Sequence, residues 1–200
     1  MYSIILAAGK SKRMGVDKAF LEINGKSFVE IITEKLKNIS KIIIVAGKHN
    51  FKKINNIYGN KFKIILNDNY KLGQINSVKL AVSYIIKNNI KESVMINLVD
   101  QPLIKKSTYK KMILEHKKNK DKIIIPFTKI EKDKNKRGHP IIIPNTYFNL
   151  ILKAPYDKGL HWVTHHKKVK VKDIYISDRN IIKDFDTYED YLKHIEKLKK

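Results

Sequence analysis

Cysteine is absent from this sequence of 200 residues. Its absence excludes disulfide bonds, thiolate metal ligands, iron–sulfur clusters and a cysteine nucleophile. Long apolar runs are absent as well. The first one ends at Gly9 and has no basic residue before it, so it is too short for a signal peptide or a membrane span. We therefore expect a cytoplasmic protein without a membrane partner.

Acidic residues are scarce: 19 Asp and Glu stand against 42 Lys and Arg, which gives a formal net charge of +23. One interpretation is a basic surface that binds nucleic acid. However, the lysines are spread along the whole chain, and aromatic residues do not alternate with them as base-stacking platforms would require. We therefore favour a compositional bias over a nucleic-acid partner. A positive field would still attract a nucleoside triphosphate.

The arrangement of apolar residues predicts an α/β protein. Short runs rich in β-branched residues indicate strands that are buried on both faces of a sheet, and they span residues 4–7, 42–46, 63–66, 94–99, 123–126, 141–143 and 169–176. Helical periodicity and capping residues predict helices at 28–36, 77–86 and 109–116, and one that opens at Thr187. The charged stretch 129–137 predicts an exposed loop. No linker divides the chain, so we expect one domain over residues 1–200.

The loop after the first predicted strand has a composition that suits phosphate binding. It contains the small residues 7–9, the hydroxyl of Ser11, and two spaced cations, Arg13 and Lys18. Small residues let backbone amides approach an anion, and the cations can bind phosphate oxygens. Ligands of open α/β sheets bind beyond the carboxyl ends of strands, where this loop lies. The P-loop and G-x-G-x-x-G patterns both fail here, so spacing alone leaves an ordinary turn as an equal alternative.

The same loop resembles the signature of a known superfamily. Leu6-Ala7-Ala8-Gly9-x-Ser11-x-Arg13-Met14-Gly15-x-x-Lys18 is similar to the motif of the MobA-like NTP transferases, and most of all to their molybdenum-cofactor cytidylyltransferase branch. Further matches follow in the family's order: Asn67, Gly73 and Ser77; Asp100-Gln101-Pro102; Gly138-His139-Pro140; Asp157-Lys158-Gly159; Asp184-Phe185-Asp186-Thr187-x-x-Asp190. The resemblance implies a single three-layer α/β/α domain of the Rossmann-like nucleotide-diphospho-sugar transferase fold, with a mostly parallel sheet.

The resemblance also implies a role for each matched residue. It assigns nucleotide binding to Leu6, Ala7, Ala8, Gly9, Ser11, Lys18, Asn67, Gly73 and Ser77. It assigns catalysis to Arg13, Lys18 and Asp100, acceptor binding to Gln101, Pro102, Gly138 and His139, and Mg²⁺ binding to Asp100 with Asp184 or Asp186. Cations and a metal suit the negative charge that develops during attack on an α-phosphate. Taken alone, Asp100 at the end of a strand is more typical of a turn or cap residue than of a metal ligand. The alternative for Asp184 and Asp186 is that they only stabilise the positive end of the helix that follows them.

The implied activity is magnesium-dependent transfer of a nucleoside monophosphate from an NTP to a phosphorylated acceptor, with release of pyrophosphate. Ala8 favours CTP, because the guanylyl branch has glycine at that position, and the implied acceptor is molybdopterin. A sugar or polyol phosphate is an alternative acceptor. A second alternative is a non-catalytic nucleotide-binding protein that assists a molybdenum hydroxylase, and Val99 in place of the usual glycine before Asp100 keeps it open. We also expect Lys18→Ala to abolish transfer and leave the fold intact, as an exposed cation contributes little to stability.

Overall fold

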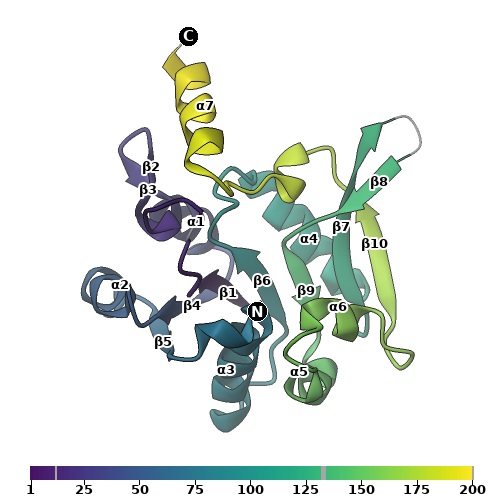
Figure 1. The fold of residues 1–200 in the computed structure, drawn as a ribbon. Coiled ribbons are helices and arrows are strands. Elements are labelled where there is room, and N and C mark those ends of the chain that lie inside the picture. The colour runs from purple at the N-terminus through teal and green to yellow at the C-terminus, as the bar shows by residue number, and fades with distance from the viewer. Residues whose placement is uncertain (12, 132–133, 200) are drawn as a thin grey trace.

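A mixed sheet of eight strands runs through the computed structural model, which describes residues 1–11, 13–131 and 134–199 (Figure 1). The strand order is β10-β7-β9-β6-β1-β4-β5, and β8 pairs with β7. Strands β6, β1, β4 and β5 are parallel, as are β7 and β10, whereas β9 is antiparallel to β6 and β7. The strands are β1 Tyr2–Ala7, β4 Lys41–Gly47, β5 Lys63–Asn67, β6 Val94–Leu98, β7 Ile123–Glu131, β8 Lys134–Arg137, β9 Ile141–Ile143 and β10 Val171–Tyr175.

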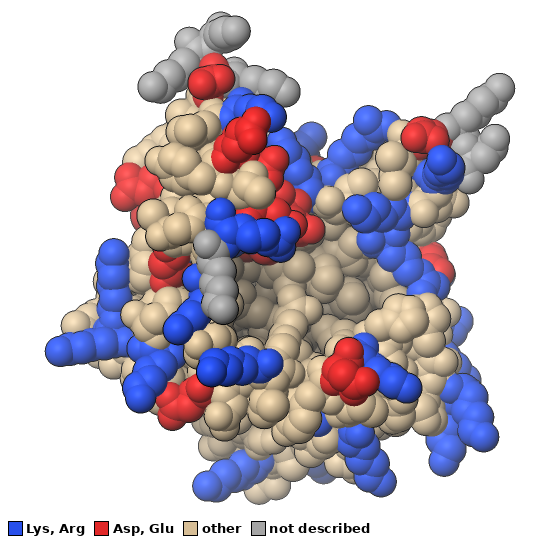
Figure 2. Space-filling view, in the orientation of Figure 1, with Lys and Arg blue, Asp and Glu red and all other residues tan. Residues whose placement is uncertain are grey.

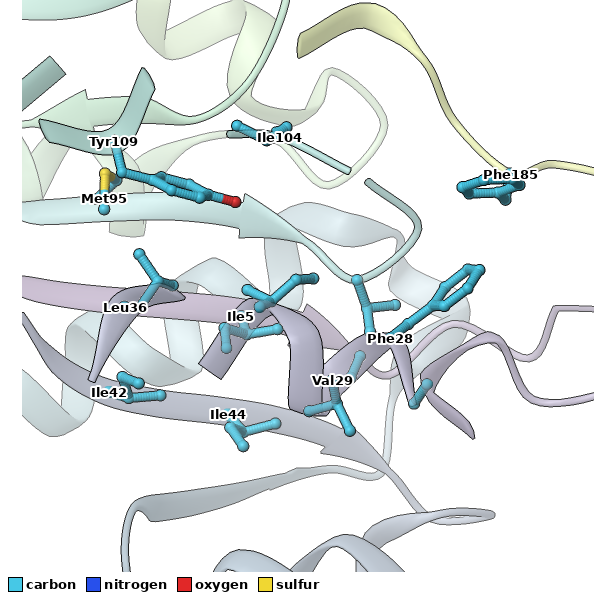
Figure 3. Close-up of a cluster of buried hydrophobic side chains, with 14 of the residues drawn as sticks. Ile5, Phe28, Val29, Leu36, Ile42, Ile44, Met95, Ile104, Tyr109 and Phe185 are labelled. Carbon is cyan, nitrogen blue, oxygen red and sulfur yellow. The ribbon is translucent and has the colours of Figure 1, made fainter. Parts of the chain in front are cut away.

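Helices cover both faces of this sheet, which explains why its strands are almost continuously apolar. Successive side chains of β1 point to opposite faces: Ile5 belongs to a core cluster with α1, α2 and α4, and Ile4 to a second cluster with α3, α5 and α6. Figure 3 shows part of the first cluster. The helices are α1 Phe28–Leu36, α2 Phe51–Tyr58, α3 Gln74–Lys87, α4 Lys106–Lys118, α5 Phe148–Lys153 and α6 Gly159–Thr164. The predicted three-layer α/β fold is confirmed.

Two helices begin at side-chain caps, of which the sequence analysis predicted the second. The Ser27 side chain accepts a hydrogen bond from Glu30 N at the start of α1. At the start of α7 (Tyr188–Lys199), Asp190 N donates to Thr187 Oγ1 over 3.2 Å, and Thr187 N donates to Asp190 Oδ2 over 3.0 Å. This reciprocal pair is the capping box expected from the threonine and the acidic residue three positions later.

The prediction of a loop at 129–137 is wrong, because most of this stretch forms strands. Residues up to Glu131 continue β7, and Lys134–Arg137 form β8, which pairs antiparallel with it; residues 132–133 lie outside the described part of the chain. Charged side chains do not prevent a backbone ladder when the strands project into solvent, as all four residues of β8 do. The sequence analysis also did not predict the helices α2, α5 and α6. Nor did it predict the two-stranded ribbon that β2 (Glu22–Ile23) and β3 (Lys26–Ser27) form.

The lengths of the helices agree with the absence of long apolar runs in the sequence. Among residues 1–11, 13–131 and 134–199, no helix has the length and apolar character that a membrane crossing requires.

Candidate active site

The phosphate-binding loop leaves the sheet at the carboxyl end of β1 and forms one wall of a cleft of about 370 Å³. The loop turns at Ser11, whose φ of 48° lies in the left-handed region that non-glycine residues rarely adopt. Met14 N and Gly15 N both donate to Ser11 O, over 2.9 and 3.2 Å, and Lys18 N donates to Ser11 Oγ over 3.3 Å. Ser11 therefore holds the turn that brings Lys18 back to the cleft.

Lys18 lies between two carboxylates that come from distant parts of the chain. Its Nζ is 3.0 Å from Asp100 Oδ2 and 3.1 Å from Asp186 Oδ1. Arg13 Nη2 is 3.7 Å from the same oxygen of Asp186, at the exposed side of the cluster. Lys18 is only 9% exposed, so the expectation that it is an exposed cation is wrong. The short helix η1 (Lys18–Phe20), capped by the Asp17 side chain, directs Lys18 inward.

Burial is the main influence on Asp100, and it raises the pKa of this carboxyl above its ordinary value. Lys18 acts in the opposite direction, and the nearby Asp184 raises the pKa further. Figure 2 shows acidic side chains gathered above a hollow in the visible face, with Lys or Arg side chains next to them and further Lys and Arg side chains spread around the outline. Two cations and two carboxylates thus meet in a protein whose acidic residues are few.

A buried aromatic ring positions the C-terminal carboxylates. Phe185 is fully buried, its ring centroid lies 5.1 Å from that of Phe28, and its N donates to Asp100 O over 3.0 Å (Figure 3). Asp184 and Asp186 flank this anchor but have different partners. Asp186 faces Lys18, whereas Asp184 Oδ1 accepts a hydrogen bond of 2.8 Å from Gln101 Nε2. Asp186 is therefore the carboxylate that completes the ion cluster with Asp100.

Three of the residues predicted to bind the acceptor pack against the segment 181–186. Gln101 Nε2 donates to Ile181 O over 3.2 Å, and His139 N donates to the same oxygen over 3.0 Å. Gly138 approaches so closely that an added Cβ would lie 2.0 Å from Ile181 O. These contacts fix the segment that carries Asp184 and Asp186, and acceptor binding by these residues stays a prediction.

The loop after Asp100 is fastened to α1 from the other side. Lys35 Nζ donates to Pro102 O over 2.5 Å and to Ile104 O over 2.9 Å. Burial lowers the pKa of Lys35 to about 8, while Asp178 acts in the opposite direction. Pro102, the fourth residue predicted to bind the acceptor, is thereby held in place through its carbonyl oxygen.

Most residues predicted to bind the nucleotide do line the cleft, namely Leu6, Ala8, Gly9, Ser11, Lys18, Gly73 and Ser77. Ala7 and Asn67 are buried beside it, and Asn67 Nδ2 donates to Ser77 Oγ over 2.8 Å. Val99 lines the cleft too. It is not among the residues with positive φ, so the backbone there does not require the glycine that the family usually has. Tyr70 and Leu98 also line the cleft, and the sequence analysis missed both.

His139 should make stability depend on pH. Its Nε2 is buried without a hydrogen-bond partner among the described residues, and burial lowers its pKa from 6.5 to about 4, although Asp184 opposes this. Between those values the unfolded chain binds a proton that the folded chain does not, so the free energy of unfolding should fall as the pH is lowered through this window. A shift of this size corresponds to about 3 kcal/mol.

Urea unfolding between pH 4 and pH 7 measures this effect. His139→Gln should flatten the pH dependence of the free energy of unfolding, since a neutral amide replaces the titrating ring. His161→Gln is the matched control, because His161 is exposed on α6. Equal slopes for the wild type and His139→Gln would contradict the assignment.

Solved structures share this fold. Rv0371c from Mycobacterium tuberculosis H37Rv superimposes with a TM-score of 0.82 at 19% identity, covering 98% of each chain. The same protein in complex with manganese gives a TM-score of 0.76 at 17% identity, covering 98% of this chain and 97% of that one.

Sequence comparisons identify the family. A probable molybdenum cofactor guanylyltransferase of Natranaerobius thermophilus is 34% identical over 129 residues, which are 62% of this chain but only 58% of that relative. The molybdenum cofactor guanylyltransferase of Campylobacter jejuni is 28% identical over 202 residues, 98% of this chain and 96% of the relative. The MobA-like NTP transferase domain matches residues 3–171. The chain therefore belongs to the MobA-like NTP transferase family and is a nucleotidyltransferase.

Proposed function

We propose that the chain transfers a nucleoside monophosphate from an NTP to a molybdopterin-type phosphorylated acceptor, with Mg²⁺ as cofactor and pyrophosphate as the second product. The observation that carries this proposal is the meeting of Lys18 and Arg13 with Asp100 and Asp186 beside the loop after β1. The relatives named as molybdenum cofactor guanylyltransferases support the class of acceptor.

The carboxylates fit a magnesium ion. Oxygens of Asp100 and Asp186 lie 3.0 and 3.1 Å from the Lys18 ammonium nitrogen, so the two carboxylates are close enough together to share one cation. No group of three or more metal-binding side chains is found within residues 1–11, 13–131 and 134–199. Magnesium accepts such a site, because it prefers one or two carboxylates and takes its other ligands from phosphates and water. The bound ion would neutralise charge on the phosphates.

The chain's own cations act on the triphosphate. Lys18 and Arg13 would bind phosphate oxygens and stabilise the charge that develops at the α-phosphorus. An oxygen of the acceptor phosphate attacks this phosphorus. The bond to the oxygen that bridges to the β-phosphate then breaks, and pyrophosphate leaves with the electron pair. No protein nucleophile is required, which agrees with the absence of cysteine.

Two observations point to different bases. The names of the matched relatives favour guanine, and we propose GTP as the first candidate. Ala8 favours cytosine, so CTP is the second candidate. Ala8 is 4% exposed and lines the cleft, where its Cβ reduces the space for a base. Both candidates use the same cleft and the same chemistry.

Calorimetric titration with GTP, CTP, ATP and UTP, each with and without Mg²⁺, tests the proposal. Tight magnesium-dependent binding of GTP or of CTP alone would support it and name the base. Ala8→Gly should then raise the affinity for GTP relative to CTP, by about tenfold if the Cβ excludes the purine. Preference for ATP or UTP would instead favour another acceptor, such as a sugar phosphate. Binding of no nucleotide would reject the proposal in favour of an accessory role.

Asp100→Asn should weaken the dependence of transfer on Mg²⁺. The amide keeps the size of the side chain but loses the charge that holds a divalent cation, so the Mg²⁺ concentration at half-maximal rate should rise at least tenfold. A metal titration of pyrophosphate release at saturating NTP measures this. Asp173→Asn is a matched control, because Asp173 pairs with Arg137 on the outer strands β10 and β8. An unchanged titration for Asp100→Asn would remove Asp100 from the metal site.

A further inference from the structure

Tyr70 lies at the other end of the cleft from the ion cluster. It opens the short helix η2 (Tyr70–Leu72), which follows β5, whereas Asp100 follows β6. The strands run in the order β6-β1-β4-β5, so three strand spacings, about 14 Å, separate the carboxyl ends of β6 and β5 along the edge of the sheet. Both residues nevertheless line the same cleft. The cleft therefore extends along the carboxyl edge, with charged groups over β6 and β1 and an aromatic ring beyond β4.

The ring of Tyr70 contacts two other loops of this edge. Lys10 Nζ lies over the ring, 5.3 Å from its centroid, and the His49 ring meets it nearly edge-on at 6.4 Å. Lys10 belongs to the loop after β1, and His49 follows β4. A face of Tyr70 is therefore turned towards the phosphate-binding loop. The adjacent Gly73, with a φ of 84°, ends η2 and lets α3 start directly behind the cleft.

The two ends of the cleft match the two ends of a nucleotide. Arg13 and Lys18 suit the triphosphate, and the flat face of Tyr70 suits a base, because every base has a π-face that can stack on an aromatic ring. Lys10 Nζ lies over this ring, 5.3 Å from its centroid, so a stacked base would take the place of a cation–π contact that the ring already makes. A base in this position would lie between the loop after β1 and the ring that faces it.

We propose that Tyr70 is the base-stacking residue of this cleft and that it binds all four bases with similar strength, leaving the choice of base to other groups. This inference rests on the proposed function, since it presumes that the cleft binds a nucleotide. The alternative is a purely structural role, in which Tyr70 only packs η2 against its neighbours.

The test compares Tyr70→Leu and Tyr70→Phe with the wild type in two titrations. One uses the four NTPs with Mg²⁺, and the other uses inorganic tripolyphosphate, which lacks a base. Tyr70→Leu should raise the Kd of the NTPs that bind by about five- to a hundredfold, by a similar factor for each, as expected for loss of a stacking aromatic. The Kd of tripolyphosphate should stay unchanged, and Tyr70→Phe should bind like the wild type.

Leu72→Ala is the matched control, because Leu72 belongs to the same short helix, is 41% exposed and does not line the cleft. If circular dichroism shows that Tyr70→Leu is not folded, Tyr70→Met takes its place in both titrations. Equal NTP binding by the wild type and Tyr70→Leu, or an equal loss of tripolyphosphate binding, would overturn the stacking role and leave the proposed function standing. Failure of the wild type to bind any NTP would overturn both.

Discussion

Lys18→Met should lower the rate of nucleotidyl transfer by about a thousandfold at saturating NTP and Mg²⁺. Methionine fills the buried channel of the lysine stem but carries no charge, so the group that stabilises the α-phosphate in the transition state is lost; removal of one such preorganised donor costs about 10²–10³ in rate. The rate of pyrophosphate release in the presence of molybdopterin measures the effect.

The same substitution should also destabilise the protein. It leaves Asp100 and Asp186 facing each other without the ammonium that lies about 3 Å from both. Circular dichroism should show a folded protein with a lower unfolding temperature. Lys10→Met removes one charge from the same loop without touching these carboxylates, and it should retain the rate of transfer within about tenfold, because its contact is with the Tyr70 ring. Full turnover by Lys18→Met would exclude Lys18 from catalysis.

Gly138→Ala should impair both activity and stability, although Gly138 does not line the cleft. The added Cβ would lie 2.0 Å from Ile181 O and 2.7 Å from Ile181 C, and backbone atoms cannot move aside as a flexible side chain does. The segment 181–186 must shift and carry Asp186 with it. A displacement of about 1 Å can lower a rate by about a hundredfold, and overpacking costs about 1–3 kcal/mol.

Thermal unfolding and the rate of transfer measure the two effects separately. Gly9→Ala is the control for stability, because a Cβ at Gly9 meets no atom within 4 Å and its φ is not positive. Its unfolding temperature should match that of the wild type, even if its place in the cleft changes nucleotide binding. If Gly138→Ala keeps both wild-type stability and wild-type rate, the close contact with Ile181 does not position the carboxylates.

Much of the fold was predictable because both faces of the sheet are buried. Strands such as β4 and β9 are therefore continuous runs of apolar residues, and they stand out in the sequence. The β7–β8 hairpin was not predictable, because its outer part is exposed and its stability comes from backbone pairing, which leaves no apolar pattern. Helix α2 was missed for a related reason, since only Ile54 and Tyr58 of its residues are buried.

The site was predictable where one continuous segment carries it, as in the loop from Leu6 to Lys18. Contacts between distant segments were not. Nothing in Asp184-Phe185-Asp186 says which carboxylate meets Lys18, because that depends on the burial of Phe185 and on the hydrogen bond from Gln101 to Asp184. Tyr70 was missed because its role depends on where η2 lies relative to the loop after β1. An aromatic residue three positions before Gly73 was the available signal.

The positions of its residues in the sequence determine when the ion cluster can form during synthesis. Lys18 and Asp186 are 168 positions apart, and the family match ends at residue 171, before the segment that supplies the second carboxylate. During synthesis from the N-terminus, the nucleotide loop and the strands β1, β4, β5 and β6 emerge long before Asp186 does. A nascent chain that has reached β10 can already pair its sheet, yet its Lys18 still lacks one of its two partners. The charged centre therefore closes only after the segment that carries Asp186 has been made.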